Sequence, residues 1–184
     1  NILVIGDLMV DQYLWGDCER ISPEAPIQII NVDKENKLLG GAGNVINNLR
    51  VLGAKVDVIS VMGDCETSIE LKGLLNDIEV DTKYLVTQKN RMTSKKSRII
   101  AAQQQVVRYD RESTDEISVK SQGLIIDSFM KIVANYEAVL LSDYGKGVLT
   151  NKLTQSLINI ANEYGKKVLI DPKGPDFSKY KGAY

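Results

Sequence analysis

Short apolar segments divide the chain into predicted strands. Residues 2–5 and 138–141 are continuously apolar, which is typical of strands buried on both faces of a parallel sheet. Residues 55–61 alternate into a further strand, and residues 167–170 form the last one before a polar turn. We expect these four segments to belong to one mostly parallel sheet.

Helical spacing of the apolar residues occurs between these strands. It predicts four helices, over residues 44–52, 66–77, 118–134 and about 153–161. Gly53 and Gly165 stand where the first and last of these helices end. Because buried strands and helices alternate, the chain is expected to adopt a doubly wound α/β fold with helices on both faces.

Two polar, β-rich stretches interrupt this alternation. The first surrounds residues 26–37, and the second contains residues 83–86 and 94–110. Neither has the continuous apolar character of a strand in a buried parallel sheet. They predict a separate small β lid over one end of the domain, with segments near residues 12–39 and 84–111.

Composition narrows the possible chemistry. The chain of 184 residues has 43% apolar residues and a net charge of −1, which is ordinary for one domain or a large part of one. It contains no histidine, which excludes Ser-His-Asp and Cys-His catalysis and most zinc enzymes. Its two cysteines form no metal or disulfide pattern, which fits a reducing cytoplasm. The chain starts directly with a strand, so its beginning is expected to be trimmed.

Polar residues and glycine follow each predicted buried strand. The segments are Gly6-Asp7, Gly63-Asp64, Asp143–Gly147 and Asp171–Gly174. A single aspartate in such a place can simply cap the next turn. In open α/β sheets, however, ligands bind beyond the carboxyl ends of the strands, so four such ends on one rim favour a shared site.

A glycine-rich stretch lies between a predicted strand and a predicted helix. Its glycines are Gly40, Gly41 and Gly43, and they let backbone amides approach a ligand closely. The following helix offers unpaired N–H groups and the positive end of its dipole. Asn44 and Asn47 add amides that can bind hydroxyl groups. This stretch is a candidate site for a polyhydroxylated small molecule.

Basic residues concentrate in the second polar stretch. Residues 89–98 contain five lysines and arginines and no acid, and Arg108 and Arg111 follow. The stretch can be a solvated face or a cationic wall for a phosphate group. Nucleic-acid binding is not expected, because aromatic residues are not interleaved with these bases. No apolar run reaches the ~20 residues that cross a bilayer, so no membrane contact is expected.

The glycine-rich stretch, with Gly53 and Gly63 after it, resembles the first signature of the PfkB/ribokinase family of sugar kinases. Within that family the resemblance extends over essentially the whole chain. It is closest to kinase domains that act on D-glycero-β-D-manno-heptose 7-phosphate. The segments that carry it are Gly6–Asp11, Ile21–Pro26, Gln104–Arg108, Ser142–Leu149 and Asp171–Gly174.

This resemblance implies transfer of phosphate from ATP, with Mg²⁺, to the 1-hydroxyl of heptose 7-phosphate. The 1,7-bisphosphate product belongs to cytoplasmic ADP-heptose synthesis for lipopolysaccharide cores. By the resemblance Asp11 holds sugar hydroxyls, and Arg108 and Lys146 serve the 7-phosphate and the pocket wall. The full set of implied substrate-binding residues is Asp11, Gly41, Gly43, Asn44, Arg108, Lys146, Asp7, Gln104 and Asp143. The lid is also expected to form a homodimer contact.

The family's Gly-Ala-Gly-Asp motif, with its catalytic base, does not occur in this sequence. Its Asn-x-x-Glu motif, which is associated with Mg²⁺, is expected soon after Tyr184. We therefore expect the catalytic base beyond Tyr184 and no catalytic or metal-binding residue within the chain. The chain is interpreted as the substrate-binding N-terminal part of one kinase domain. The alternatives are another PfkB-type sugar or sugar-phosphate kinase, and a non-catalytic fragment for sugar-phosphate binding or dimerisation.

Overall fold

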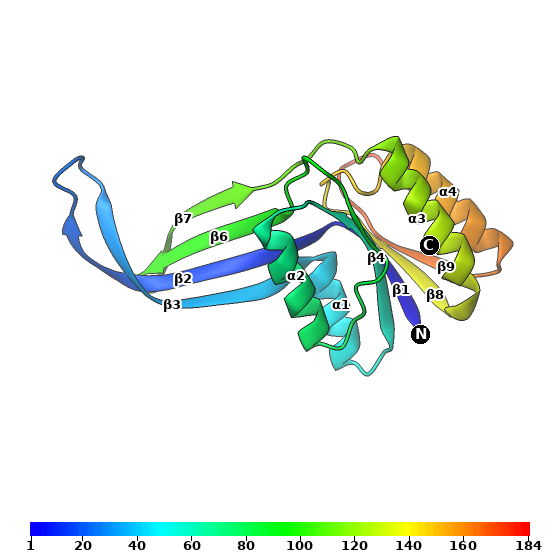
Figure 1. Ribbon diagram of the computed structural model, residues 1–184, viewed down its shortest axis with the longest axis horizontal. Helices are drawn as coiled ribbons and strands as arrows, with labels where there is room; N and C mark the ends of the chain where they lie inside the picture. The colour runs from blue at the N-terminus through cyan, green and yellow to red at the C-terminus, as the bar shows by residue number, and fades with distance from the viewer.

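The computed structural model describes residues 1–184, which form two sheets (Figure 1). The larger sheet has five parallel strands in the order β5-β4-β1-β8-β9. In chain order they are β1 Ile2–Gly6, β4 Val56–Met62, β5 Leu85–Thr87, β8 Ala138–Ser142 and β9 Lys167–Asp171. The predicted parallel sheet is therefore present.

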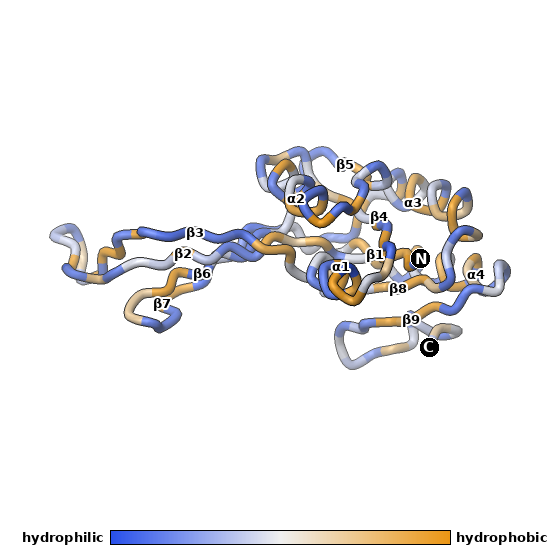
Figure 2. Tube along the Cα trace, turned by 90° about the horizontal axis from the view of Figure 1, so that it is seen from below, coloured by the Kyte–Doolittle hydropathy of each residue, from blue (hydrophilic) through white to orange (hydrophobic).

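Four helices cover the two faces of the larger sheet. They are α1 Ala42–Val51, α2 Glu66–Asp77, α3 Val119–Ile132 and α4 Asn151–Glu163. Alternate residues of β1 point to opposite faces: Val4 packs in a core cluster with α1 and α2, whereas Leu3 and Ile5 pack in a second cluster with α3 and α4. The buried strands and helix stripes stand out in orange in Figure 2. The predicted doubly wound α/β fold is confirmed.

The smaller sheet, which we call the lid, extends away from this body (Figure 1). Its order is β3-β2-β6-β7, with β2 and β6 parallel and the outer pairs antiparallel. The strands are β2 Leu8–Ile21, β3 Gln28–Gly41, β6 Ser94–Ala101 and β7 Gln104–Arg111. The lid is mostly hydrophilic along its length (Figure 2), as the polar segments of the sequence predict.

The ends of the lid strands differ from the prediction in two places. Strand β2 starts at Leu8, directly after β1, because Leu8 and Val10 are buried in the core cluster under α1. Strand β5, at Leu85–Thr87, joins the larger sheet beside β4 instead of the lid. Leu85 and Val86 pack against the two core clusters. The apolar side chains of this short segment are therefore buried more fully in the body than they would be in the polar lid.

The last residues follow β9. Short 3₁₀ turns occupy Val133–Asn135 and Ser178–Tyr180. The backbone N–H of Tyr184 donates to Val168, and that of Ile170 donates to Tyr184, at 2.8 and 3.2 Å. This is the pattern of a parallel bridge, so Tyr184 lies beside β9 as a further position of the larger sheet. None of the helices is long and apolar enough to cross a membrane.

One acidic side chain ties the lid to the body. Glu70 of α2 accepts hydrogen bonds from Lys37 of β3 at 2.7 Å and from Lys95 of β6 at 3.0 Å. Burial alone would raise the pKa of Glu70, but the two lysine ammonium groups outweigh it and lower that pKa. Glu70 therefore helps to set how the lid stands on α2.

We expect Glu70→Gln to reduce the free energy of unfolding by about 1–2 kcal/mol at neutral pH. Because the pKa of Glu70 is lowered in the folded state, its contribution is present above the unfolded pKa and is lost as pH falls through the folded pKa. Urea unfolding at several pH values tests this. Glu163→Gln, at an exposed and unpaired position, is the control, and an equal cost of Glu70→Gln at all pH values would contradict the expectation.

Candidate functional site

Asp7 lies at the point where the chain leaves β1 for the lid. It is 1% exposed, and its carboxylate accepts three backbone N–H groups from the loop after β8. The donors are Tyr144 at 2.8 Å, Lys146 at 3.0 Å and Val148 at 3.1 Å. Desolvation raises the pKa of Asp7, although the three amides act in the opposite direction. Asp7 therefore fixes the loop after β8 against the end of β1.

Asp11 lies on β2, close to the base of the lid, and its carboxylate is partly exposed. Its Oδ1 accepts a hydrogen bond of 2.6 Å from the guanidinium of Arg98 on β6. The side chains of Asp11 and Arg98 are 20% and 19% exposed, so the pair is largely but not wholly buried. The Arg98 guanidinium also lies over the ring of Tyr13, 5.1 Å from its centroid.

The glycine turn joins β3 to α1 beside Asp11. A Cβ on Gly40 would overlap Oδ2 of Asp11, so the missing side chain makes room for that carboxylate. Gly41 has φ of 55°, in the left-handed region, and a Cβ there would approach the carbonyl of Asp7 and the end of Met9. The turn is therefore shaped around the two aspartates.

Helix α1 begins immediately after this turn. No side chain caps it, and its first turn contains no acidic residue. The N–H of Ala42 donates to the carbonyl of Asp7 at 3.0 Å, and the other amides at this end of the helix have no side-chain acceptor, so they are available to a ligand. Asn44 lies in the first turn and is exposed, and Gly43 is buried where a Cβ would press against Leu39. Ile46 is fully buried in the core under α1.

The loop after β8 is connected to the base of the lid through Lys146. Its Nζ donates to Glu112 at 2.6 Å, and its backbone carbonyl accepts a hydrogen bond from Arg91. Arg91 is 7% exposed and also donates to the carbonyl of Asp115 at 3.0 Å. Burial lowers the pKa of the Arg91 guanidinium. Lys146 therefore connects the loop to the segment just before β6 and to the residue just after β7.

Asp143 lies in the same loop and is 3% exposed. Its Oδ1 accepts from the N–H of Gly145 at 2.8 Å, and its Oδ2 accepts from the hydroxyl of Tyr180 at 2.7 Å. The ammonium of Lys179 also pairs with Asp143. Burial alone would lower the pKa of Lys179, and the carboxylate reverses that effect.

The predicted site residues fall into three groups. Asp11, Gly41, Gly43 and Asn44 lie together at the base of the lid. Asp7, Lys146 and Asp143 lie around the loop after β8. The other two predicted residues lie on β7 and are exposed: Arg108, paired with Asp110 at 3.1 Å, and Gln104.

Gln104 is not brought close to Asp11. It pairs with Ala101, which is level with Gly16 on β2. Five residues separate Gly16 from Asp11, which amounts to roughly 16 Å along a strand.

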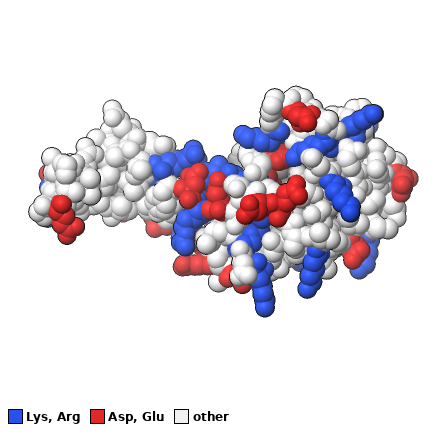
Figure 3. Space-filling view, turned by 90° about the horizontal axis from the view of Figure 1, so that it is seen from above, with Lys and Arg blue, Asp and Glu red and all other residues white.

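Arg98 and Arg91 are the site residues that sequence reasoning did not single out. Both belong to the basic stretch, but their roles depend on strand pairing and on contacts with distant loops. Figure 3 shows lysine, arginine, aspartate and glutamate side chains gathered where the lid meets the body. The alternation of side chains along β6 is a signal that could have identified Arg98.

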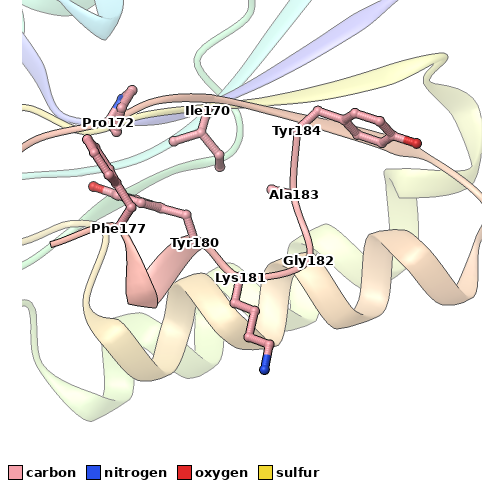
Figure 4. A pocket seen from close by; sticks show the side chains of 8 residues that line it. All are labelled: Ile170, Pro172, Phe177, Tyr180, Lys181, Gly182, Ala183 and Tyr184. Carbon is pink, nitrogen blue, oxygen red and sulfur yellow. The ribbon is translucent and has the colours of Figure 1, made fainter.

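Two hollows lie near this region. One, of about 570 Å³, is at the base of the lid and is lined by Asp64, Cys65, Asn90, Arg91, Met92, Asp110, Arg111, Glu112 and Ser113. The other, of about 410 Å³, lies beside β9 (Figure 4) and is lined by Ile170, Pro172, Phe177, Tyr180, Lys181, Gly182, Ala183 and Tyr184. The second is mainly apolar and contains none of the predicted site residues. No group of three or more acidic or cysteine side chains is arranged to hold a metal ion.

Solved structures place this fold among ribokinase-like proteins. A structure of Arabidopsis thaliana ribokinase complexed with ribose and ATP matches 95% of this chain and 54% of its own, with 17% identity and a TM-score of 0.64. The tetrameric inhibited form of phosphofructokinase-2 from Escherichia coli matches 97% of this chain and 57% of its own, with 18% identity and a TM-score of 0.67. At these identities the likeness concerns the fold.

The sequence matches the pfkB family of carbohydrate kinases over residues 1–183, and the chain belongs to that family. It is 62% identical over 184 residues to the bifunctional protein HldE of Aliarcobacter butzleri (strain RM4018). It is 54% identical over 183 residues to HldE of Campylobacter fetus subsp. fetus (strain 82-40). The chain is covered completely in both comparisons but spans only 39% and 40% of these relatives.

Proposed function

We propose that this chain is the sugar-binding part of a kinase that phosphorylates D-glycero-β-D-manno-heptose 7-phosphate at its 1-hydroxyl. The observation that carries this proposal is the 62% identity to an HldE protein along the entire chain. The motifs that resemble heptose 7-phosphate kinases support it, because Asp11 and the glycine turn lie side by side at the base of the lid.

The arrangement suits a sugar chemically. The carboxylate of Asp11 can accept hydrogen bonds from two hydroxyl groups, and the free amides of α1 can donate to a sugar oxygen. Asn44 offers both a donor and an acceptor from the same turn. The lid can exclude water, which would otherwise compete with the sugar as phosphate acceptor.

Phosphate transfer in this proposal uses ATP, with Mg²⁺ to neutralise the charge on the phosphates. We propose that the residues for ATP, Mg²⁺ and the catalytic base lie outside these 184 residues, because the chain covers only 39% of its HldE relative. The chain's own part is to bind and orient the sugar phosphate. We place this reaction in the cytoplasm, as part of ADP-heptose synthesis.

A panel of acceptors tests the proposed substrate. We expect the complete protein that contains this chain to have its highest kcat/KM with heptose 7-phosphate, above fructose 6-phosphate, fructose and ribose. A preference for one of the other sugars would refute the substrate assignment and leave the family unchanged. A protein that binds sugar phosphate but transfers no phosphate would favour a non-catalytic binding role.

Substitutions at the proposed sugar site should affect the sugar and not the nucleotide. We expect Asp11→Ala and Asn44→Ala to raise the KM for the sugar and lower kcat, each at a cost of about 1–3 kcal/mol. Steady-state kinetics with both substrates varied measures this, with Asp17→Ala on the outer lid as the control. If the kinetics were unchanged, neither residue would bind the sugar, and both would serve only to stabilise the local turn.

The lid is also the proposed contact of a homodimer. The β2–β3 hairpin continues past the ends of β6 and β7 (Figure 1), and a two-stranded ribbon is marginally stable alone. Near its tip, Ile21 and Ile27 are 68% and 60% exposed. A second copy of the chain would cover them. Sedimentation of the protein should then give a dimer that Ile21→Glu weakens, and a monomeric wild type would contradict this.

A further inference from the structure

One face of the lid collects charged side chains in ordered rows. Residues directly opposite one another in a sheet share a face, so the strand register defines these rows. The first row across β2, β6 and β7 is Asp11, Lys96 and Asp110. The second row, one pleat further out, is Tyr13, Arg98 and Arg108. We call this surface the Asp11 face.

The two rows differ in charge balance. In the first row Lys96 stands between two carboxylates, which is a favourable arrangement. In the second row Arg98 stands directly opposite Arg108, and the carboxylates that pair with them, Asp11 and Asp110, both belong to the first row. Like charges directly opposite each other across a strand pair are destabilising, and an anion between the two guanidinium groups would relieve this repulsion. The second row is therefore suited to bind an anion.

The guanidinium of Arg98 has unused hydrogen-bond donors and a fixed orientation, as binding such an anion requires. Only one of its five N–H donors makes a hydrogen bond within the chain, the one to Asp11. The ring of Tyr13 and the carboxylate of Asp11 hold the guanidinium plane in one orientation. A guanidinium fixed in this way can bind a phosphate group through two parallel hydrogen bonds.

We propose that Arg98, assisted by Arg108, binds the phosphate group that the sugar substrate already carries, and so makes the site specific for a phosphorylated sugar. This inference rests on the proposed function. The ion pair between Arg98 and Asp11 joins the phosphate contact to the hydroxyl contact in one unit.

The spacing of the two rows supports this assignment. Successive residues on one face of a strand are roughly 7 Å apart, so the phosphate row lies about that distance beyond the Asp11 row. A sugar whose hydroxyls bind at Asp11 can place a terminal phosphate there, because several bonds separate the two groups. The acceptor hydroxyl at the other end of the sugar then points toward the body and the turn before α1.

The test compares phosphorylated and unphosphorylated heptose as acceptors for the complete protein. We expect Arg98→Gln to lower kcat/KM for heptose 7-phosphate by roughly 10–100-fold, since a charge-assisted contact is lost. Its kcat/KM for heptose without phosphate and its KM for ATP should change little, so that the preference for the phosphate collapses. Arg98→Lys, which keeps the charge but not the fork, should lie between.

Arg111→Gln is the matched control, because Arg111 lies on β7 opposite Lys95, on the other face of the lid. It should retain the wild-type preference. An equal loss for both sugars in Arg98→Gln would overturn the proposal, because Arg98 would then act only by holding Asp11.

The proposed function and this inference fail in different ways. A wild type that prefers fructose 6-phosphate refutes heptose as the substrate. In that case wild type and Arg98→Gln are compared with fructose 6-phosphate and fructose as acceptors. This comparison tests whether Arg98 binds the phosphate group, whichever sugar carries it. A wild type that accepts only sugars without phosphate overturns the contact as well.

Discussion

Replacing Asp7 by alanine is expected to unfold or severely destabilise the protein, with a loss of about 3 kcal/mol or more. Three backbone amides of the loop after β8 would lose their acceptor, and each buried donor left unpaired costs about 1–3 kcal/mol. Because Lys146 is one of the three donors, the loop would also release the base of the lid. Urea unfolding measures the loss.

The control for Asp7 is Asp127→Ala, at an exposed position on α3, which should leave stability almost unchanged. The outcome that would contradict us is an Asp7→Ala protein with wild-type stability and weakened sugar binding. Asp7 would then be a substrate-binding residue, as the sequence resemblance implies.

Gly63→Ala is expected to have an effect of similar size for a different reason. Gly63 follows β4, and a Cβ there would overlap the backbone carbonyl of Arg91. Its N–H also donates to the hydroxyl of Thr93 at 2.8 Å, and its carbonyl accepts from Ser68 at 2.7 Å. The backbone cannot move away without breaking these bonds, so we expect a cost of about 3 kcal/mol or more.

Gly73→Ala provides the matched control for Gly63. Gly73 lies inside α2, and a Cβ there meets nothing within 4 Å. Alanine should therefore raise stability by about 0.5–1 kcal/mol through its better helix propensity. Thermal unfolding of both variants distinguishes the effects. If Gly63→Ala were tolerated as well as Gly73→Ala, the contact between β4 and the lid base would not be rigid.

Much of the body could be predicted from the sequence because its signals are local. The apolar run at residues 2–5 and the stripes of α2 and α4 reflect burial on known faces, and these elements form where expected. The start of the lid could not be located in this way. Leu8 is buried in the core of the body beside α1, and this burial explains its apolar side chain. It nevertheless belongs to β2, which is a lid strand.

The sequence motifs singled out residues that lie close together in the structure, but not the contacts that these residues make, and their role in binding stays a prediction. The glycine turn and Asp11 were found from motifs, and they do lie together. The partner of Asp11, however, is Arg98, which is 87 residues away in the sequence. Lys146 was expected at the pocket wall, yet its three polar groups bind Asp7, Glu112 and Arg91. Such pairings depend on strand register and loop packing, which no local spacing encodes.

Calorimetric titration with heptose 7-phosphate tests most directly whether the base of the lid is the sugar site. We expect the complete wild-type protein to bind heptose 7-phosphate in the absence of ATP, and Asp17→Ala to bind it equally well. Asp11→Ala should bind it at least roughly 10-fold more weakly, as expected for a lost buried hydrogen bond. Unchanged affinity in Asp11→Ala would contradict the proposal and place the sugar elsewhere in the protein.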